Sequence, residues 1–127
     1  MAKLLLIGCG GGVGAILRYL VAGWGQALTS GSFPLGTLVV NVAGCLVIGW
    51  LGTLLTGPVL VREEVRMALL VGVLGGFTTF STFGFETGSL LSDGEWAQAL
   101  LNVALSNGLG LAALFLGFRL ARLTHGG

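Results

Sequence analysis

Four long apolar stretches alternate with short polar segments along this chain. They run from Leu4 to about Trp24, from about Leu35 to Thr56, from Met67 to about Leu91, and from about Trp96 to Leu120. Each has about the 20 residues that an α-helix needs to cross the hydrocarbon core of a bilayer. The pattern therefore predicts an all-α membrane protein with four transmembrane helices.

The segments between these stretches are short and polar. Gln26 to Pro34 is rich in Gly and Ser, a charge cluster runs from Arg62 to Arg66, and the last segment is Ser92 to Glu95. We expect Ser92 or Asp93 to cap the fourth helix, because both side chains accept hydrogen bonds from the first amides of a helix. No segment is long enough to fold separately, so we interpret residues 1–127 as a single four-helix transmembrane domain.

Composition supports the membrane interpretation and excludes several other functions. Hydrophobic residues make up 54% of the chain and charged residues 9%, whereas soluble domains carry about 25% charged residues. The formal charge is +1, and no basic stripe could neutralise a row of phosphates, so nucleic acid is not expected as a partner. His125 is the only histidine, and no nucleophile–base pair or metal cluster can be assembled from these spans. We predict that the protein is not an enzyme and has no catalytic residues.

The third stretch contains a glycine pair followed closely by four hydroxyl residues, within Gly75 to Phe83. Backbone that leaves the helix at membrane depth is tolerated only where it is buried in protein or lines a watery cavity. The third helix is therefore predicted to be broken and to mark an ion path. Four helices are too few to surround a pore, so we expect the broken segment to face a second copy of the chain.

Polar residues also occur inside the first and second spans, where they are costly and usually functional. Arg18 lies near the end of the first span. Its side chain either attracts an anion, extends to the membrane surface, or pairs with backbone carbonyls. Asn41 lies well inside the second span and offers two amide donors to a passing ion or to a neighbouring helix.

The third and fourth spans each carry a stripe at helical spacing. Phe80, Phe83 and Glu86 are three residues apart and are expected to share a face, whereas Asn102 and Ser106 are four apart. The two stripes could face each other.

Amide and hydroxyl donors with an arginine nearby suit an anion, and the edges of aromatic rings carry partial positive charge. Glu86 fits such a path only if it is protonated, paired or at the mouth, and the two phenylalanines could instead be packing residues.

Three sequence blocks together resemble the signature of the Fluc fluoride channels, also called CrcB proteins. The blocks are Gly11–Tyr19, Gly36–Gly44 and Gly75–Phe83. They occur in the expected order, and the length and the four-span plan match over the whole chain. The resemblance implies a passive, fluoride-selective channel that exports toxic fluoride across the plasma (inner) membrane of a prokaryote. It also implies a dual-topology homodimer, in which two copies are inserted antiparallel, with two pores.

The resemblance assigns roles to individual residues. Asn41 corresponds to a pore asparagine, and Phe80 and Phe83 correspond to paired phenylalanines whose ring edges face the fluoride path. Further positions matched to the path are Ser81 and Thr82 within the same motif, Ser106 in the fourth helix, and Glu86 near the pore.

Gly75 and Thr78 match positions whose backbone carbonyls, from both copies, hold a structural sodium ion at the dimer centre. A glycine-broken helix suits this role, because its carbonyls lack intrahelical partners and need a donor, water or an ion.

Two features of the sequence bear on these expectations. Family members can carry tyrosine where Asn102 stands and serine where Gly110 stands, so the fourth-helix polar track departs from the family pattern. The alternative is a proton-coupled transporter of cations resembling the small multidrug-resistance proteins, but the first span lacks the embedded glutamate that such a transporter uses.

The distribution of positive charge bears on insertion. Most Lys and Arg residues lie at or near one side of the membrane: Lys3, Arg62, Arg66, Arg119 and Arg122. The positive-inside rule alone therefore predicts a fixed orientation with both termini in the cytoplasm, whereas dual insertion requires a weak bias.

Overall fold

Helices form where the sequence predicts the apolar spans. The computed structural model describes residues 1–125, so the last two residues of the predicted domain lie outside the described residues. In it, α1 covers Ala2–Gln26, α2 covers Leu35–Leu55 and α6 covers Trp96–His125. The third span is divided into α3 (Glu63–Met67), the π-helix η1 (Ala68–Val73), α4 (Leu74–Phe77) and α5 (Phe80–Ser92).

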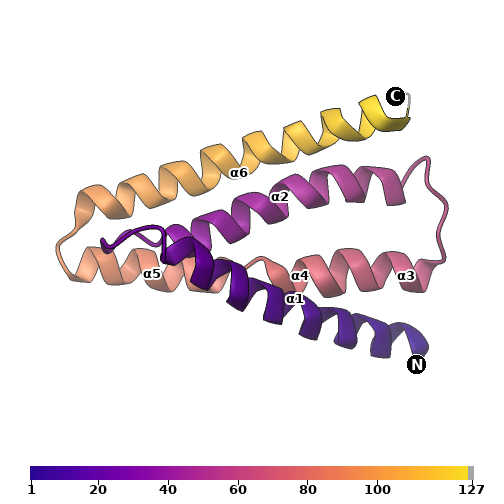
Figure 1. The fold of residues 1–127 in the computed structure, drawn as a ribbon, viewed down its shortest axis with the longest axis horizontal. Helices are drawn as coiled ribbons and strands as arrows, with labels where there is room; N and C mark the ends of the chain where they lie inside the picture. Colours follow the sequence, from indigo (N-terminus) through magenta and orange to yellow (C-terminus); the bar gives the residue numbers. More distant parts are fainter. Residues whose placement is uncertain (126–127) are drawn as a thin grey trace.

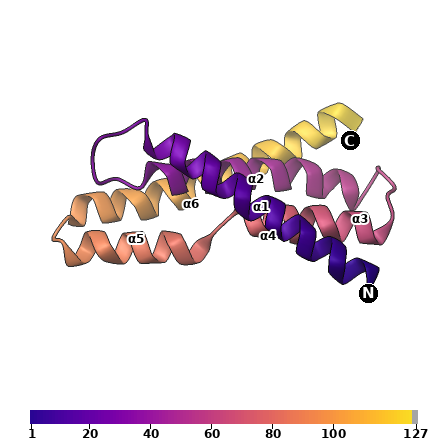
Figure 2. The ribbon, with the colours of Figure 1, turned by 60° about the horizontal axis from the view of Figure 1, so that its bottom comes forward.

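Four spans of the described chain are long and apolar enough to cross a membrane: Ala2–Gln26, Leu35–Leu55, Glu63–Ser92 and Trp96–His125. The all-helical fold is therefore confirmed, and so is the break in the third span. Thr78 and Thr79 both adopt extended backbone angles, with φ and ψ of −83° and 158° at Thr78 and −151° and 116° at Thr79. Figure 2 shows this segment as a thin connection between α4 and α5.

Several helices extend beyond the predicted spans at their charged ends. The third span begins at Glu63 instead of Met67, and the fourth continues to His125 instead of Leu120. Hydropathy marks where hydrocarbon ends, whereas a helix keeps its internal hydrogen bonds in the interface and beyond. An ion pair of 2.8 Å between Lys3 Nζ and Glu63 Oε1 joins the first turns of α1 and α3 there.

The start of the fourth helix differs from the prediction. Ser92 is the last residue of α5, and Asp93 caps the C-terminus of α5 instead of the N-terminus of α6. Gly94, with φ of 78°, supplies the left-handed turn that ends α5. α6 therefore begins at Trp96, and the carbonyl of the preceding residue, Glu95, accepts a hydrogen bond from Ala99 N–H at 3.0 Å.

The two halves of the third span have different neighbours. α1 packs against η1, α4 and α2, whereas α5 packs chiefly against α6. α2 and α6 lie side by side over much of their length (Figure 1). The third span therefore packs against α1 before the break at Thr78 and Thr79, and chiefly against α6 after it.

Glycines allow these helices to approach closely. A Cβ atom added at Gly14 of α1 would collide with the carbonyl oxygen of Val73 in η1, and one added at Gly49 of α2 would collide with the carbonyl oxygen of Leu114 in α6. Such small-residue contacts are the usual means of helix association in lipid, where the hydrophobic effect between helices is absent.

The two ends of the helix bundle differ in charge. The N-terminus, the C-terminal end of α6 and the α2–α3 connection lie at one end (Figures 1 and 2). That end carries five basic residues, Lys3, Arg62, Arg66, Arg119 and Arg122, together with Glu63 and Glu64. The opposite end carries Asp93 and Glu95, and Ser32 Oγ of the α1–α2 loop donates to Glu95 Oε2 at 2.6 Å.

We predict that Gly14→Ala destabilises the fold, because the added methyl group meets backbone of η1 that cannot move without shifting the helix. Overpacking of this kind costs about 1–3 kcal/mol. Thermal unfolding in detergent, followed by circular dichroism, should show a lower melting temperature.

Gly8→Ala is the matched control in the same helix, since a Cβ there meets nothing within 4 Å. It should leave stability unchanged or raise it by up to about 1 kcal/mol, as Ala is the better helix former. Equal melting temperatures for the two variants would contradict the close packing of α1 on η1.

Candidate functional site

The break in the third span removes the helical donors of several carbonyl groups, among them those of Gly75 and Thr78. In a continuous helix, the N–H of Thr79 would donate to Gly75 O, and the N–H of Thr82 to Thr78 O. Instead, Thr79 N–H donates to Asn41 Oδ1 at 2.8 Å, and Thr82 N–H donates to Thr79 Oγ1 at 3.2 Å. The helical donors of Gly75 O and Thr78 O thus bind side chains instead. These are the two carbonyls that the family resemblance assigns to the sodium site.

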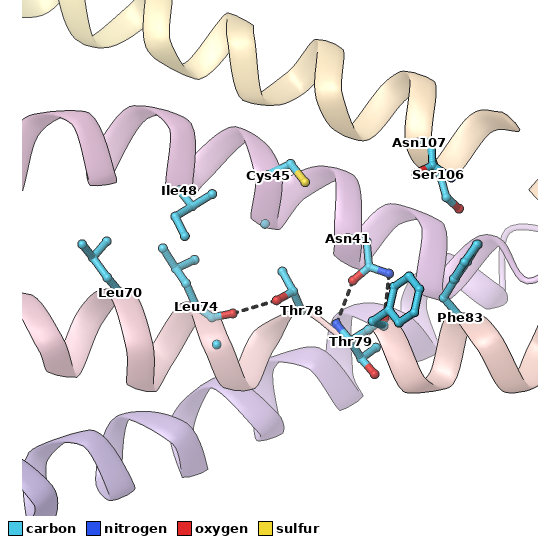
Figure 3. A pocket seen from close by; sticks show the side chains of 13 residues that line it. Asn41, Cys45, Ile48, Leu70, Leu74, Thr78, Thr79, Phe83, Ser106 and Asn107 are labelled. Carbon is cyan, nitrogen blue, oxygen red and sulfur yellow. Dashed lines mark hydrogen bonds between the residues drawn. The ribbon is translucent and has the colours of Figure 1, made fainter. Parts of the chain in front are cut away.

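Asn41 of α2 binds both backbone groups of one residue at the break. Besides accepting from Thr79 N–H, it donates from Nδ2 to Thr79 O at 3.0 Å (Figure 3). Of the two partners that the sequence left open for the amide donors, the neighbouring third span therefore takes one. One N–H of the amide remains for another partner.

Arg18 of α1 reaches the same break from the other side. Its Nε donates to the carbonyl of Gly76 at 3.0 Å, so of the interpretations that the sequence left open, pairing with a backbone carbonyl is the one observed. In a continuous helix this carbonyl would accept from Phe80 N–H. A side chain from the first span thus replaces a donor that the break removes.

Two open cavities meet at Thr79, which lines both. The first has a volume of about 330 Å³, and its polar and aromatic lining includes Asn41, Thr78, Thr79, Phe80, Phe83, Ser106 and Asn107, with Gly75 at its wall. The second has a volume of about 660 Å³, and its lining includes Arg18, Thr37, Thr79, Thr82 and Glu86.

The predicted stripe on the third span is divided between these cavities. Phe80 and Phe83 line the first cavity and Glu86 lines the second, so the expectation that all three share a face is wrong. Residues six apart differ by about 120° around a helix, and the offset turns Glu86 away. Ser81 is exposed and lies outside the lining of both cavities.

The two phenylalanines form a pair at the start of α5. Their ring centroids are 5.5 Å apart and the ring planes are tilted by 43°. Phe80 is 83% exposed in the single chain, so most of its ring surface is available to lipid or to another protein surface. Thr79, whose Oγ1 donates to Thr82 Oγ1 at 3.1 Å, lines the first cavity together with both rings.

Glu86 places a carboxylate oxygen where it receives no hydrogen bond from residues 1–125, although the atom, Oε1, is buried. Burying such an oxygen without a donor is costly. Thr82 and Arg18 line the same cavity. The Glu86 carboxylate, which would repel an anion when ionised, therefore lies at the second cavity, apart from the phenylalanine pair.

Polar residues of the third and fourth spans do face each other. Ser106 Oγ donates to Asn102 Oδ1 at 3.2 Å, and Asn102 Nδ2 donates to Thr87 Oγ1 at 2.9 Å. Thr87 Oγ1 in turn donates to Phe83 O at 2.8 Å. Asn102, which is 2% exposed, links α6 to α5 through its bond to Thr87, while Ser106 lines the first cavity.

Sequence reasoning missed two residues of this site, Thr79 and Thr87. Thr79 is the N-cap of α5 and the residue that Asn41 holds. Its signal was present, because a threonine just before a helix start is a preferred N-cap. Thr87 carried no comparable signal, since its role depends on where Asn102 of another helix lies.

The fold and site define a multi-pass helical membrane protein with a polar break in its third span. A family model described as "CrcB-like protein, Camphor Resistance (CrcB)" matches residues 5–118. The chain belongs to this CrcB family.

Curated relatives match the chain over nearly its whole length. Proteins named "Fluoride-specific ion channel FluC" from Desulforapulum autotrophicum and Geobacter sulfurreducens are each 46% identical to it, and one from Rhizobium etli is 43% identical. The matches cover 95% of this chain and 97% of the relative for the first, and 96% and 98% for the other two.

Proposed function

We propose that this chain is a passive, fluoride-selective ion channel that exports fluoride across the inner membrane of a prokaryote. The name shared by its full-length relatives supports the ion and the mechanism class, a channel and not an enzyme. The alternative, proton-coupled transport of cations, is not favoured. Helix α1, Ala2–Gln26, contains no Asp or Glu that could couple a proton to such transport.

The observation that carries this proposal is the meeting of opposite helix ends at the break. The helical run from Glu63 to Phe77 ends there with free carbonyls, and α5 begins there with free N–H groups. The C-terminal end of a helix carries partial negative charge and the N-terminal end partial positive charge. Half-helices inside membranes use these ends to bind cations and anions respectively.

The anion path belongs at the positive, N-terminal end of α5. The N–H groups of Phe80 and Ser81 precede the first helical hydrogen bond, and the hydroxyls of Ser81 and Thr82 stand beside them. Fluoride is small and strongly hydrated, so a selective path must replace its water with strong donors while a narrow bore excludes larger anions. Phenylalanine edges add partial positive charge without a fixed cation to trap the ion.

Further donors continue this path. Ser106 and the remaining amide N–H of Asn41 line the first cavity, and Arg18 lines the second. We assign Arg18 the additional role of raising the local concentration of anions through its charge. Glu86 then stands at the second cavity, near the mouth of the path.

We propose that the functional unit is an antiparallel homodimer. Phe80 is largely exposed and Gly75 is exposed with open space beyond its Cα atom, and both line the open first cavity. A second copy would cover this polar wall, which a single chain presents to lipid. Inverting one copy also sets the basic end of each chain beside the acidic end of the other.

We propose a structural sodium ion where the two copies meet. The carbonyls of Gly75 and Thr78 fit such an ion, because their helical donors are diverted to Asn41 and Thr79. Two copies would supply these neutral oxygens twice, a set that suits a small monovalent cation. The ion would neutralise the carbonyl dipoles that converge at the interface.

The first test is ion flux. Proteoliposomes loaded with fluoride should release it passively, and only when a second conductor shunts the accumulated charge, whereas chloride release should stay at the level of protein-free vesicles. Release can be followed with a fluoride electrode and a chloride electrode. Equal fluoride and chloride flux, or uptake of a quaternary ammonium compound against its gradient, would instead favour the transporter class.

The second test concerns the phenylalanine pair. Phe80→Ile and Phe83→Ile keep apolar bulk but remove the ring edges, so each should slow fluoride flux about two- to tenfold, corresponding to ~0.5–1.5 kcal/mol per ring contact. Phe115→Ile, an exposed ring on α6 outside both cavities, is the control and should conduct normally. Normal flux from both α5 variants would make the pair packing residues.

The third test is removal of sodium. If the ion binds only the dimer, sodium at 100 times its dissociation constant stabilises the dimer by about 2.7 kcal/mol. Replacing sodium with N-methyl-D-glucamine at constant ionic strength should therefore increase the monomer fraction measured by cross-linking in detergent. An unchanged monomer fraction after exhaustive exchange would count against the cation.

A further inference from the structure

We propose that Asn41 is the positioning residue that keeps the third span open and thereby frees the Gly75 carbonyl for the cation. The inference rests on the proposed sodium site and adds the residue that creates it. Asn41 itself contacts no carbonyl of that site. It acts through Thr79, whose N–H and C=O it holds at 2.8 Å and 3.0 Å.

Two acceptors compete for one backbone donor. Thr79 N–H can donate to Asn41 Oδ1, as observed, or to Gly75 O, as in a continuous helix. The two bonds exclude each other, because the second requires helical angles at Thr78 and Thr79 where the structure has extended ones. Without the Asn41 acceptor, forming the helical bond is the way to satisfy this N–H in a membrane.

The side-chain amide of Asn41 is oriented so that its oxygen, and not its nitrogen, faces Thr79 N–H. The bond from Nδ2 to Thr79 O sets that orientation. The neighbouring carbonyl, Gly76 O, accepts a hydrogen bond from the guanidinium of Arg18, whose positive charge disfavours a cation at that oxygen. Arg18 from α1 thus pairs with Gly76 O. Asn41 from α2 binds the N–H of Thr79, and Gly75 O is left for another partner.

This positioning role is separable from any direct contact between Asn41 and an anion. Asn41→Leu removes the acceptor and the donor together. Asn41→Asp keeps an oxygen acceptor for Thr79 N–H but removes every N–H that could reach an anion. Asn107→Leu is a matched control, because Asn107 lines the same cavity but donates only to Val103 O of its own helix, at 2.8 Å.

The experiment titrates the purified full-length proteins with sodium in detergent and measures the dimer fraction by cross-linking, with fluoride flux measured separately in proteoliposomes. Loss of a residue that orients metal ligands typically weakens metal affinity by about 10–100-fold. The sodium midpoint should rise by that factor for Asn41→Leu. It should stay near or below the wild-type value for Asn41→Asp, and near it for Asn107→Leu. Fluoride flux should fall in Asn41→Asp despite its intact sodium response.

A wild-type sodium midpoint in Asn41→Leu would overturn the inference. If that variant does not assemble at any sodium concentration, Asn41→Asp decides: a retained sodium response supports the role of the acceptor, and a lost response overturns it. A wild-type protein that conducts fluoride but ignores sodium would overturn both the cation and this inference while leaving the channel proposal standing.

Discussion

The structure depends on satisfying the backbone where the third span leaves the helix. In hydrocarbon, each unpaired amide or carbonyl costs several kcal/mol. The extended angles at Thr78 and Thr79 release donors and acceptors on both sides of the break. Asn41 from α2 and Arg18 from α1 bind Thr79 and Gly76 there. The break is therefore a property of three spans together, although it is encoded in one.

Close helix packing is what brings these two side chains to the break. Gly14 lets α1 approach η1, and Gly44 of α2 makes room for the methyl group of Thr78, with which an added Cβ would collide. Larger residues at these positions would hold the helices apart and leave the backbone of the break without partners. The glycines thus serve packing and, through packing, the polar chemistry of the site.

The break also gives one short segment two electrostatic characters. The helical run ending at Phe77 presents carbonyl oxygens, and α5 presents amide hydrogens, so negative and positive helix ends lie a few residues apart. These two helix ends meet without a charged side chain in the lining of the first cavity. The one buried carboxylate oxygen without a partner in the described chain, Glu86 Oε1, lies on the second cavity instead.

The sequence alone determined the four spans, their order and the break, because hydropathy and the glycine-hydroxyl motif are local properties of the chain. It was less successful at helix ends: it did not show that α1 and α3 would be joined by Lys3 and Glu63, or that Gly94 would move the start of α6 beyond Asp93. Helices continue past the apolar region, where hydropathy gives no signal.

Only the tertiary structure decided which polar groups meet. Three outcomes depend on the rotation of each helix against its neighbours. Asn41 uses one donor on Thr79, Arg18 pairs with Gly76 O, and Glu86 lines the second cavity. The π-helix at Ala68–Val73 precedes α4 and the break, and its wider turn rotates the residues of α4 out of the 3.6-residue period. Residue spacing cannot specify such rotations, because they are set by the packing of separate helices.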